Sequence, residues 1–125
     1  MNKVRIVFAD PEQNNLNAFQ ANFRRIEEYE LLTCLSAEQL KIIIKNVCVN
    51  VLILDQRILE VLGNNFLHIH KNNGVTCIVV TTYREVSDLE KAHKDKLLHC
   101  YFTKPYNTED LHLSIKEALE RKQAS

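Results

Sequence analysis

The feature that most constrains the fold is a short apolar run at residues 51–54 (VLIL), which ends at Asp55. Four consecutive apolar residues, two of them β-branched, favour a strand that is covered on both faces, as in a parallel sheet between layers of helices. Asp55 then lies at the carboxyl end of that strand. In open parallel sheets, ligands bind outside this edge. The run therefore predicts both the type of sheet and the place of its site.

Three other apolar, strand-like runs end in polar residues in the same way. The polar residues that follow them are Asp10, Thr81 and Lys104. Because parallel strands bring their carboxyl ends to one edge of the sheet, we expect these residues to lie near Asp55. Two carboxylates, one hydroxyl and one ammonium group then form a single candidate site.

The rest of the chain alternates strand-like runs with segments that have helical spacing of apolar residues. We expect strands at about residues 3–9, 30–35, 51–55, 76–81 and 99–103, each followed by a helical segment. After Asp55, the apolar face of the segment is predicted to comprise Ile58, Leu59, Leu62, Phe66 and Ile69, with an interruption at Gly63. Strict alternation predicts a doubly wound α/β fold with a parallel sheet and helices on both faces. A chain of 125 residues fits one domain, residues 1–125.

The first helix is predicted to begin directly after the first strand. Asp10 suits the N-cap, Pro11 the first helical position, and Glu12 the positive end of the helix dipole. Asp10 therefore has two interpretations, as a carboxylate of the site or only as a helix cap.

Composition argues against several classes of protein. Lys+Arg and Asp+Glu both number 16, whereas nucleic-acid and membrane-surface binders usually have a basic excess. No apolar stretch approaches the ~18 residues of a membrane span, and no signal-peptide pattern is present, so we expect a cytoplasmic protein. The four cysteines lack the spacing of metal or redox motifs and are predicted to be buried, reduced thiols. With only Gly63 and Gly74, no glycine-rich loop is available for a flavodoxin-like redox enzyme.

Taken together and in this order, the strand-end residues resemble the receiver domain of two-component response regulators, over essentially the whole chain. Asp10 matches the first acid of the family's acid pair, and Asp55 matches its phosphoacceptor. Thr81 matches the hydroxyl position, and Lys104 matches the lysine of the Lys-Pro motif. Tyr101, three residues earlier, matches the aromatic switch position. The resemblance implies a (βα)5 flavodoxin-like receiver fold with strand order 2-1-3-4-5.

The resemblance also implies a function, as a phosphorylation switch and not as a metabolic enzyme. Asp55 would accept a phosphoryl group from a sensor histidine kinase or a phosphotransfer protein. Lys104 would pair with the added charge, and Thr81 would hydrogen-bond a phosphoryl oxygen. The only catalysis implied is the domain's own phosphotransfer and dephosphorylation.

Two departures from the family pattern concern the acceptor loop and the metal site. Leu59 stands where a proline is usual, and Pro11 replaces the second acid of the pair. The family's Mg²⁺ would be held by Asp10, Asp55 and the main-chain carbonyl of Arg57, with Glu12 as the only nearby substitute for the missing acid. Since proline offers no side-chain ligand, we expect the metal to bind weakly.

Signalling is expected to pass through residues 84–94, Tyr101 and the last helix, to a partner protein or an output domain. A homodimer through the face formed by residues 84–125 is a further expectation. An alternative is an atypical pseudo-receiver, a protein-interaction module that does not depend on phosphorylation, and Pro11 favours it. Thr81 could also reflect β-propensity alone, and Tyr101 could be an ordinary half-buried strand aromatic.

Overall fold

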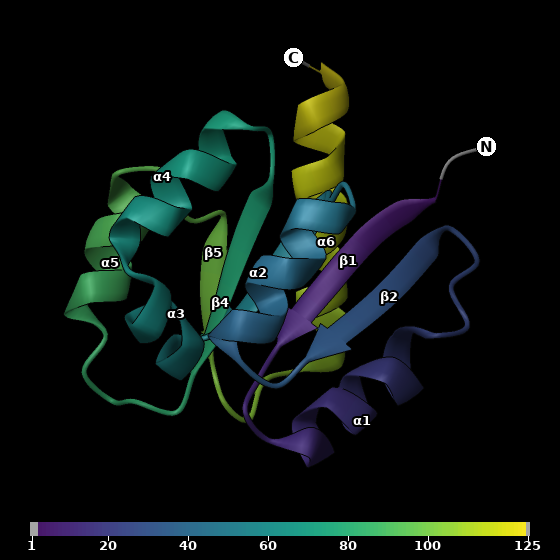
Figure 1. Ribbon diagram of the computed structural model, residues 1–125, viewed down its shortest axis with the longest axis horizontal. Helices are drawn as coiled ribbons and strands as arrows, with labels where there is room; N and C mark the ends of the chain where they lie inside the picture. The colour runs from purple at the N-terminus through teal and green to yellow at the C-terminus, as the bar shows by residue number, and fades with distance from the viewer. Residues whose placement is uncertain (1–2, 125) are drawn as a thin grey trace.

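Five parallel strands form the centre of the molecule, in the order β2-β1-β3-β4-β5 (Figure 1). The computed structural model describes residues 3–124, with side chains for residues 3–121. The strands are β1 (Val4–Ala9), β2 (Tyr29–Cys34), β3 (Val51–Asp55), β4 (Thr76–Thr81) and β5 (Cys100–Thr103). All four neighbouring pairs are parallel. The predicted strands, sheet type and strand order are confirmed, with strand ends that differ by at most one residue.

Six helices connect and follow the strands within the described residues. They are α1 (Gln13–Phe23), α2 (Ala37–Asn46), α3 (Gln56–Leu62), α4 (Asn64–Asn72), α5 (Ser87–Lys94) and α6 (Thr108–Ala124). The one helical segment expected after Asp55 is instead two helices, α3 and α4, separated by Gly63. This glycine has φ 86° and ψ 163°, a conformation that residues with a side chain rarely adopt. The helix therefore ends there, and a second one starts in a new direction.

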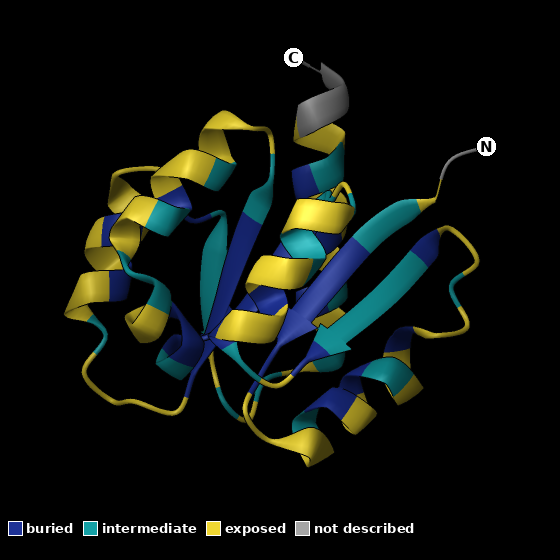
Figure 2. Ribbon diagram, viewed as in Figure 1, coloured by how far each residue is buried: buried dark blue, intermediate teal, exposed yellow. Residues whose placement is uncertain are grey.

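The sheet separates two apolar clusters, because successive side chains of a strand point to opposite faces. Helices α1 and α6 cover one face, and α2 to α5 cover the other (Figure 1). In β3, Val51 and Ile53 belong to the cluster under α1 and α6, whereas Leu52 and Leu54 belong to the cluster under α2 to α5. All five residues of this strand are buried, as Figure 2 shows for the centre of the sheet. The prediction that the 51–54 run is covered on both faces is confirmed.

The new direction of α4 changes which of its residues face the core. Ile69 was predicted on the apolar face but is 49% exposed, so that prediction is wrong. Leu67 takes the buried place, with 0% exposure. The physical reason is Gly63, which breaks the helical phase that a continuous helix would carry from Ile58 and Leu59 into the next turns.

The cysteines only partly follow the prediction of buried thiols. All four are free, and Cys34 and Cys77 are buried. Cys100 is half-buried, but Cys48 is exposed in the connection after α2, so the prediction is wrong for this residue. Burial raises the pKa of the Cys34 thiol to about 11, which leaves it protonated near neutral pH.

Within the described residues, no helix is long and apolar enough to cross a membrane.

The contrast between Leu67 and Ile69 gives a test of the packing of α4. Leu67→Ala should lower the free energy of unfolding by about 2–5 kcal/mol, because it leaves a cavity in the core. The matched change Ile69→Ala should cost about 0.5 kcal/mol, as is usual at the surface. Urea denaturation of both variants measures the difference. A larger loss for Ile69→Ala than for Leu67→Ala would show that α4 packs in the phase of a continuous helix.

Candidate functional site

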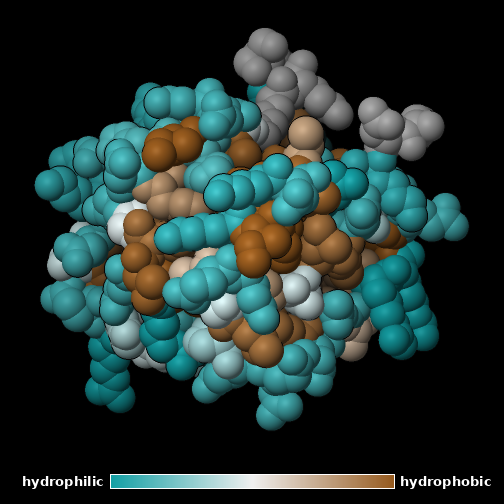
Figure 3. Space-filling view, in the orientation of Figure 1, coloured by the Kyte–Doolittle hydropathy of each residue, from teal (hydrophilic) through white to brown (hydrophobic). Residues whose placement is uncertain are grey.

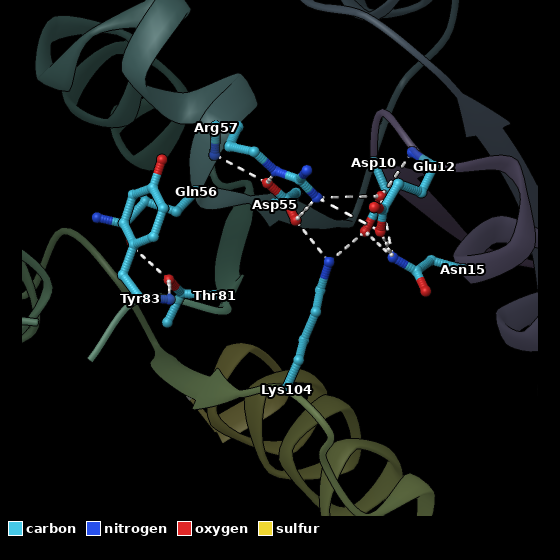
Figure 4. Close-up of polar contacts among 9 residues, drawn as sticks. All are labelled: Asp10, Glu12, Asn15, Asp55, Gln56, Arg57, Thr81, Tyr83 and Lys104. Carbon is cyan, nitrogen blue, oxygen red and sulfur yellow. Dashed lines mark hydrogen bonds and ion pairs between the residues drawn. The ribbon is translucent and has the colours of Figure 1, made fainter. Parts of the chain in front are cut away.

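The ammonium group of Lys104 joins two carboxylates at the carboxyl edge of the sheet. Lys104 follows β5, and its Nζ lies 2.6 Å from Asp10 Oδ2 and 2.5 Å from Asp55 Oδ2 (Figure 4). Asp10 is 0% exposed and Asp55 is 1% exposed. The three residues come from the ends of β1, β3 and β5, so the structure brings them together as the strand-end argument predicts. Their chemical roles stay predictions.

Asp55 also caps helix α3, which begins at the next residue. Its Oδ1 accepts hydrogen bonds from the Arg57 main-chain N–H at 2.8 Å and from the Arg57 Nε at 2.9 Å. Its Oδ2 accepts a bond from the Arg57 Nη2 at 3.0 Å, in addition to the bond from Lys104. Burial by itself raises the pKa of Asp55, but the hydrogen bonds from Arg57 and Lys104 outweigh it and hold this pKa below its ordinary value. The acceptor candidate is therefore a fully paired carboxylate anion.

The guanidinium of Arg57 is the main functional group that the sequence analysis missed. The sequence analysis gave this residue only a main-chain role, yet its Nη2 also lies 3.9 Å from Asp10 Oδ1 and 3.6 Å from Glu12 Oε2. Figure 4 shows the side chain stretched from Asp55 towards Asp10 and Glu12. The hydrogen bond to Asp55 raises the pKa of Arg57 above its ordinary range. A basic residue two positions after a strand-end acid, in the first turn of a helix, was the available signal.

The connection from β1 to α1 differs from the prediction. Helix α1 begins at Gln13, with Glu12 as an extended N-cap residue that makes no side-chain cap, so Asp10 is not the N-cap and Pro11 is not the first helical residue. Asp10 Oδ1 instead accepts the Glu12 main-chain N–H at 2.8 Å. Asn15, from the first turn of α1, places its Nδ2 3.2 Å from each Asp10 carboxylate oxygen. The Asp10 carboxylate therefore lies between Lys104 and the start of α1 without capping that helix.

Thr81, at the end of β4, reaches the same edge but makes different contacts. Its hydroxyl donates to Gln56 Oε1 at 2.5 Å and accepts the Tyr83 main-chain N–H at 2.9 Å (Figure 4). Gln56 is a buried polar residue that the sequence analysis did not single out, and no sequence signal marks it. In this state Thr81 is paired with the first residue of α3, and its role towards a phosphoryl group stays a prediction.

Tyr101 lies in the middle of β5, beneath helix α5. It is half-buried and packs against the apolar cluster that α5 covers. Its ring meets that of His93 edge-on, with centroids 6.2 Å apart. In the sheet it is paired with Val79, two residues before Thr81. The structure thus places Tyr101 between the sheet and α5, and its role as a switch stays untested.

Solved receiver-domain structures share this architecture over nearly the whole chain. The signal receiver domain of an HD domain-containing protein from Pseudomonas fluorescens is similar in structure, with a TM-score of 0.86 and 21% identity. The aligned region covers 99% of this chain and 100% of that chain. A CheY-like response regulator receiver domain protein from Methanospirillum hungatei covers 98% of both chains, with a TM-score of 0.83 and 25% identity. The chain has the receiver-domain fold. A response regulator receiver domain protein from Clostridium thermocellum covers 97% of this chain and 98% of its own, with a TM-score of 0.77 and 25% identity. Neither a protein-family model nor a curated protein sequence matches the chain.

As arranged here, the acidic edge of the sheet does not fit the divalent cation that the resemblance implies. Pro11 offers no ligand, and the oxygens of Asp10 and Asp55 already accept bonds from ammonium, guanidinium and amide donors. Among the residues whose side chains are described, no group of three His, Cys, Asp or Glu side chains could hold a metal ion. The expected Mg²⁺ site, with Glu12 as a further ligand, therefore stays a prediction that the geometry does not support.

Removal of the bridging ammonium group tests how far the two carboxylates depend on it. Lys104→Met leaves Asp10 with no cation closer than the Arg57 guanidinium, 3.9 Å away, so the free energy of unfolding should fall by about 3 kcal/mol. Lys41→Met, a matched change at an exposed lysine of α2, should change it by at most about 0.5 kcal/mol. Urea denaturation at neutral pH measures both.

A double variant separates charge from packing in that experiment. Because Asp10→Asn removes one of the two negative charges, Lys104→Met combined with Asp10→Asn should be more stable than Lys104→Met alone. A double variant that is less stable than both single variants would show that Lys104 acts through its packing and not through the ion pair.

Proposed function

We propose that this chain is a response regulator receiver domain that accepts a phosphoryl group on Asp55 and signals by a change of conformation. The observation that carries the proposal is the Lys104 ammonium, 2.5 Å from a buried carboxylate at the end of the central strand. Phosphoryl transfer needs positioning and compensation of charge more than covalent help from the protein. A fixed carboxylate beside a fixed cation meets both needs, and the receiver-domain fold supports this function.

The donor in this proposal is the phosphohistidine of a sensor histidine kinase or of a phosphotransfer protein. An oxygen of Asp55 forms a bond to phosphorus while the bond from phosphorus to the imidazole nitrogen breaks. The electron pair of that bond stays on the imidazole. Lys104 then pairs with the phosphoryl oxygens, whose charge is roughly −1.5 to −2 by analogy with phosphorylated hydroxyls. Hydrolysis of the acyl phosphate resets the domain, so the protein acts as a switch and catalyses only its own modification.

Access to Asp55 in this proposal depends on the Arg57 side chain. Asp55 is 1% exposed, and both of its carboxylate oxygens accept bonds from Arg57. The Arg57 side chain itself is 37% exposed, and in this proposal it turns outwards to free the carboxylate. The donor group reaches Asp55 from that side.

A small phosphodonor tests the acceptor. Incubation with acetyl phosphate should add one phosphoryl mass to the protein, as read by intact mass spectrometry, and none to Asp55→Asn. The matched variant Asp95→Asn removes an exposed carboxylate at the end of α5 and should still gain the mass. Modification that persists in Asp55→Asn would refute the assignment of Asp55.

A second function is favoured by the ion pairs that already occupy Asp55 and by the missing acid at position 11. Arg57 pairs with Asp55, and Pro11 removes one of the family's acids, which suits a pseudo-receiver that works as a protein-interaction module without phosphorylation. The same mass experiment separates the two functions. A folded protein that takes no phosphoryl group from acetyl phosphate or from a phosphorylated histidine donor would favour the interaction module.

The output surface in this proposal comprises α5, β5 and α6. Tyr101 packs in the apolar cluster that α5 covers, and Thr81 ends β4, the strand paired with β5, so movement of Thr81 towards a phosphoryl group would reach Tyr101 and then α5. Only Leu89 and Ala92 of α5 are buried, which makes this helix easy to shift. A partner protein, an output domain or a second copy of the chain would bind the expected face of residues 84–125, of which residues 122–125 lie outside the described side chains and Leu113 is an exposed apolar residue.

Amide hydrogen exchange tests the path of the signal. Treatment with acetyl phosphate should change exchange rates in residues 82–94 and around Tyr101, because the phosphoryl group shifts the population of two conformations of this region. Asp55→Asn, treated in the same way, should show no change. Changes confined to α1 and α2 would contradict the proposed path.

A further inference from the structure

We propose that the guanidinium of Arg57 takes the place of a divalent cation in this acidic site, so that the domain binds no metal there and accepts its phosphoryl group without one. The phosphoryl part of this inference rests on the proposed function, whereas the metal part does not. Its basis is the position of one nitrogen atom among three carboxylates. The Arg57 Nη2 lies 3.0 Å from Asp55 Oδ2, 3.6 Å from Glu12 Oε2 and 3.9 Å from Asp10 Oδ1.

The two buried carboxylates of the site are balanced by two cations that the protein itself supplies. Two buried carboxylates, Asp10 and Asp55, face two cations, Lys104 and Arg57, and Glu12 adds one exposed carboxylate. A divalent ion placed among them would meet two positive groups within a few ångströms. Like charges at such distances disfavour each other, so the ion could enter only if the guanidinium left.

The one carboxylate that could replace the missing acid is already paired. Glu12 Oε2 accepts a bond from Asn15 Nδ2 at 2.8 Å and lies 3.6 Å from the Arg57 guanidinium. Pro11, in the bend before it, offers no side-chain ligand. A metal ion that used Glu12 Oε2 as a ligand would therefore have to displace both of these contacts.

A guanidinium can also compensate the charge of the phosphoryl oxygens, as a metal ion would. Its planar set of N–H donors forms paired hydrogen bonds with phosphate oxygens as well as with carboxylates. With acetyl phosphate as donor, an Asp55 oxygen forms the bond to phosphorus, the bond from phosphorus to the acetate oxygen breaks, and the electron pair leaves with acetate. Arg57 turns from the carboxylate to the phosphoryl oxygens, and Lys104 keeps the second cationic contact.

Binding of Mn²⁺ to the whole chain tests the metal part directly. Electron paramagnetic resonance of free Mn²⁺ should show no saturable binding to the wild type. Arg57→Ala should show saturable binding, at least about tenfold tighter than the weakest affinity that the experiment detects, which corresponds to about 1.4 kcal/mol. The matched variant Arg25→Ala loses the same charge at an exposed position of the α1–β2 connection and should behave as the wild type. Arg57→Gln, which keeps most of the side chain, serves as a second variant if Arg57→Ala does not fold.

Phosphoryl uptake, read by intact mass, tests the second part. The wild type should take up phosphoryl groups from acetyl phosphate equally with Mg²⁺ and with an excess of chelator, and Arg57→Ala should do so only with Mg²⁺. Wild-type uptake that stops in the chelator would overturn this part.

The metal result and the phosphoryl result can fail separately. Equal Mn²⁺ affinity in the wild type and Arg57→Ala, or no gain in affinity in any Arg57 variant, overturns the inference whatever the phosphoryl result. A wild type that takes up no phosphoryl group under any condition contradicts the proposed function and the metal-free transfer, but leaves the Mn²⁺ comparison as the test of Arg57.

Discussion

A single ammonium group between two buried carboxylates is the interaction on which the edge of this sheet depends. Asp10 and Asp55 end the neighbouring strands β1 and β3, and without a cation their negative charges would face each other away from water. Lys104 comes from β5, with β4 between, so its long side chain has to cross the end of β4. The positions of Thr81, Gln56 and the start of α3 all adjoin this crossing.

Two features of the site shift its charge in the same direction. Pro11 offers no carboxylate where the resembled family has its second acid, and Arg57 adds one positive charge beside the remaining acids. The site is therefore less negative than the same strand ends would be with a carboxylate at position 11 and no cation at position 57. A site altered in this way needs less compensation from solution ions, whether its function is phosphoryl transfer or the binding of a partner.

The strand-end residues of the site could be predicted from the sequence, whereas the side chains at the starts of helices could not. Asp10, Asp55 and Lys104 were found because the end of a parallel strand fixes where its next residue lies, whatever the helices do. Arg57, Gln56 and Asn15 were missed because their side chains leave first helical turns, and sequence periodicity does not give the direction of a side chain at a helix start. Asp10 was also expected to suit the N-cap of the first helix because local propensity favours it there, but that helix begins at Gln13 and Asp10 pairs with Lys104.

The sequence distances spanned by the Lys104 bridge bear on how the chain folds. The lysine is separated by 94 residues from Asp10 and by 49 from Asp55, so both contacts close long loops. Contacts of high sequence separation slow folding, and this one also needs three strands in register. We therefore expect β1 and β3 to associate first and the acidic pair to wait for the docking of β5. During that interval the two carboxylates remain hydrated, which makes the completed site a marker of the fully folded chain.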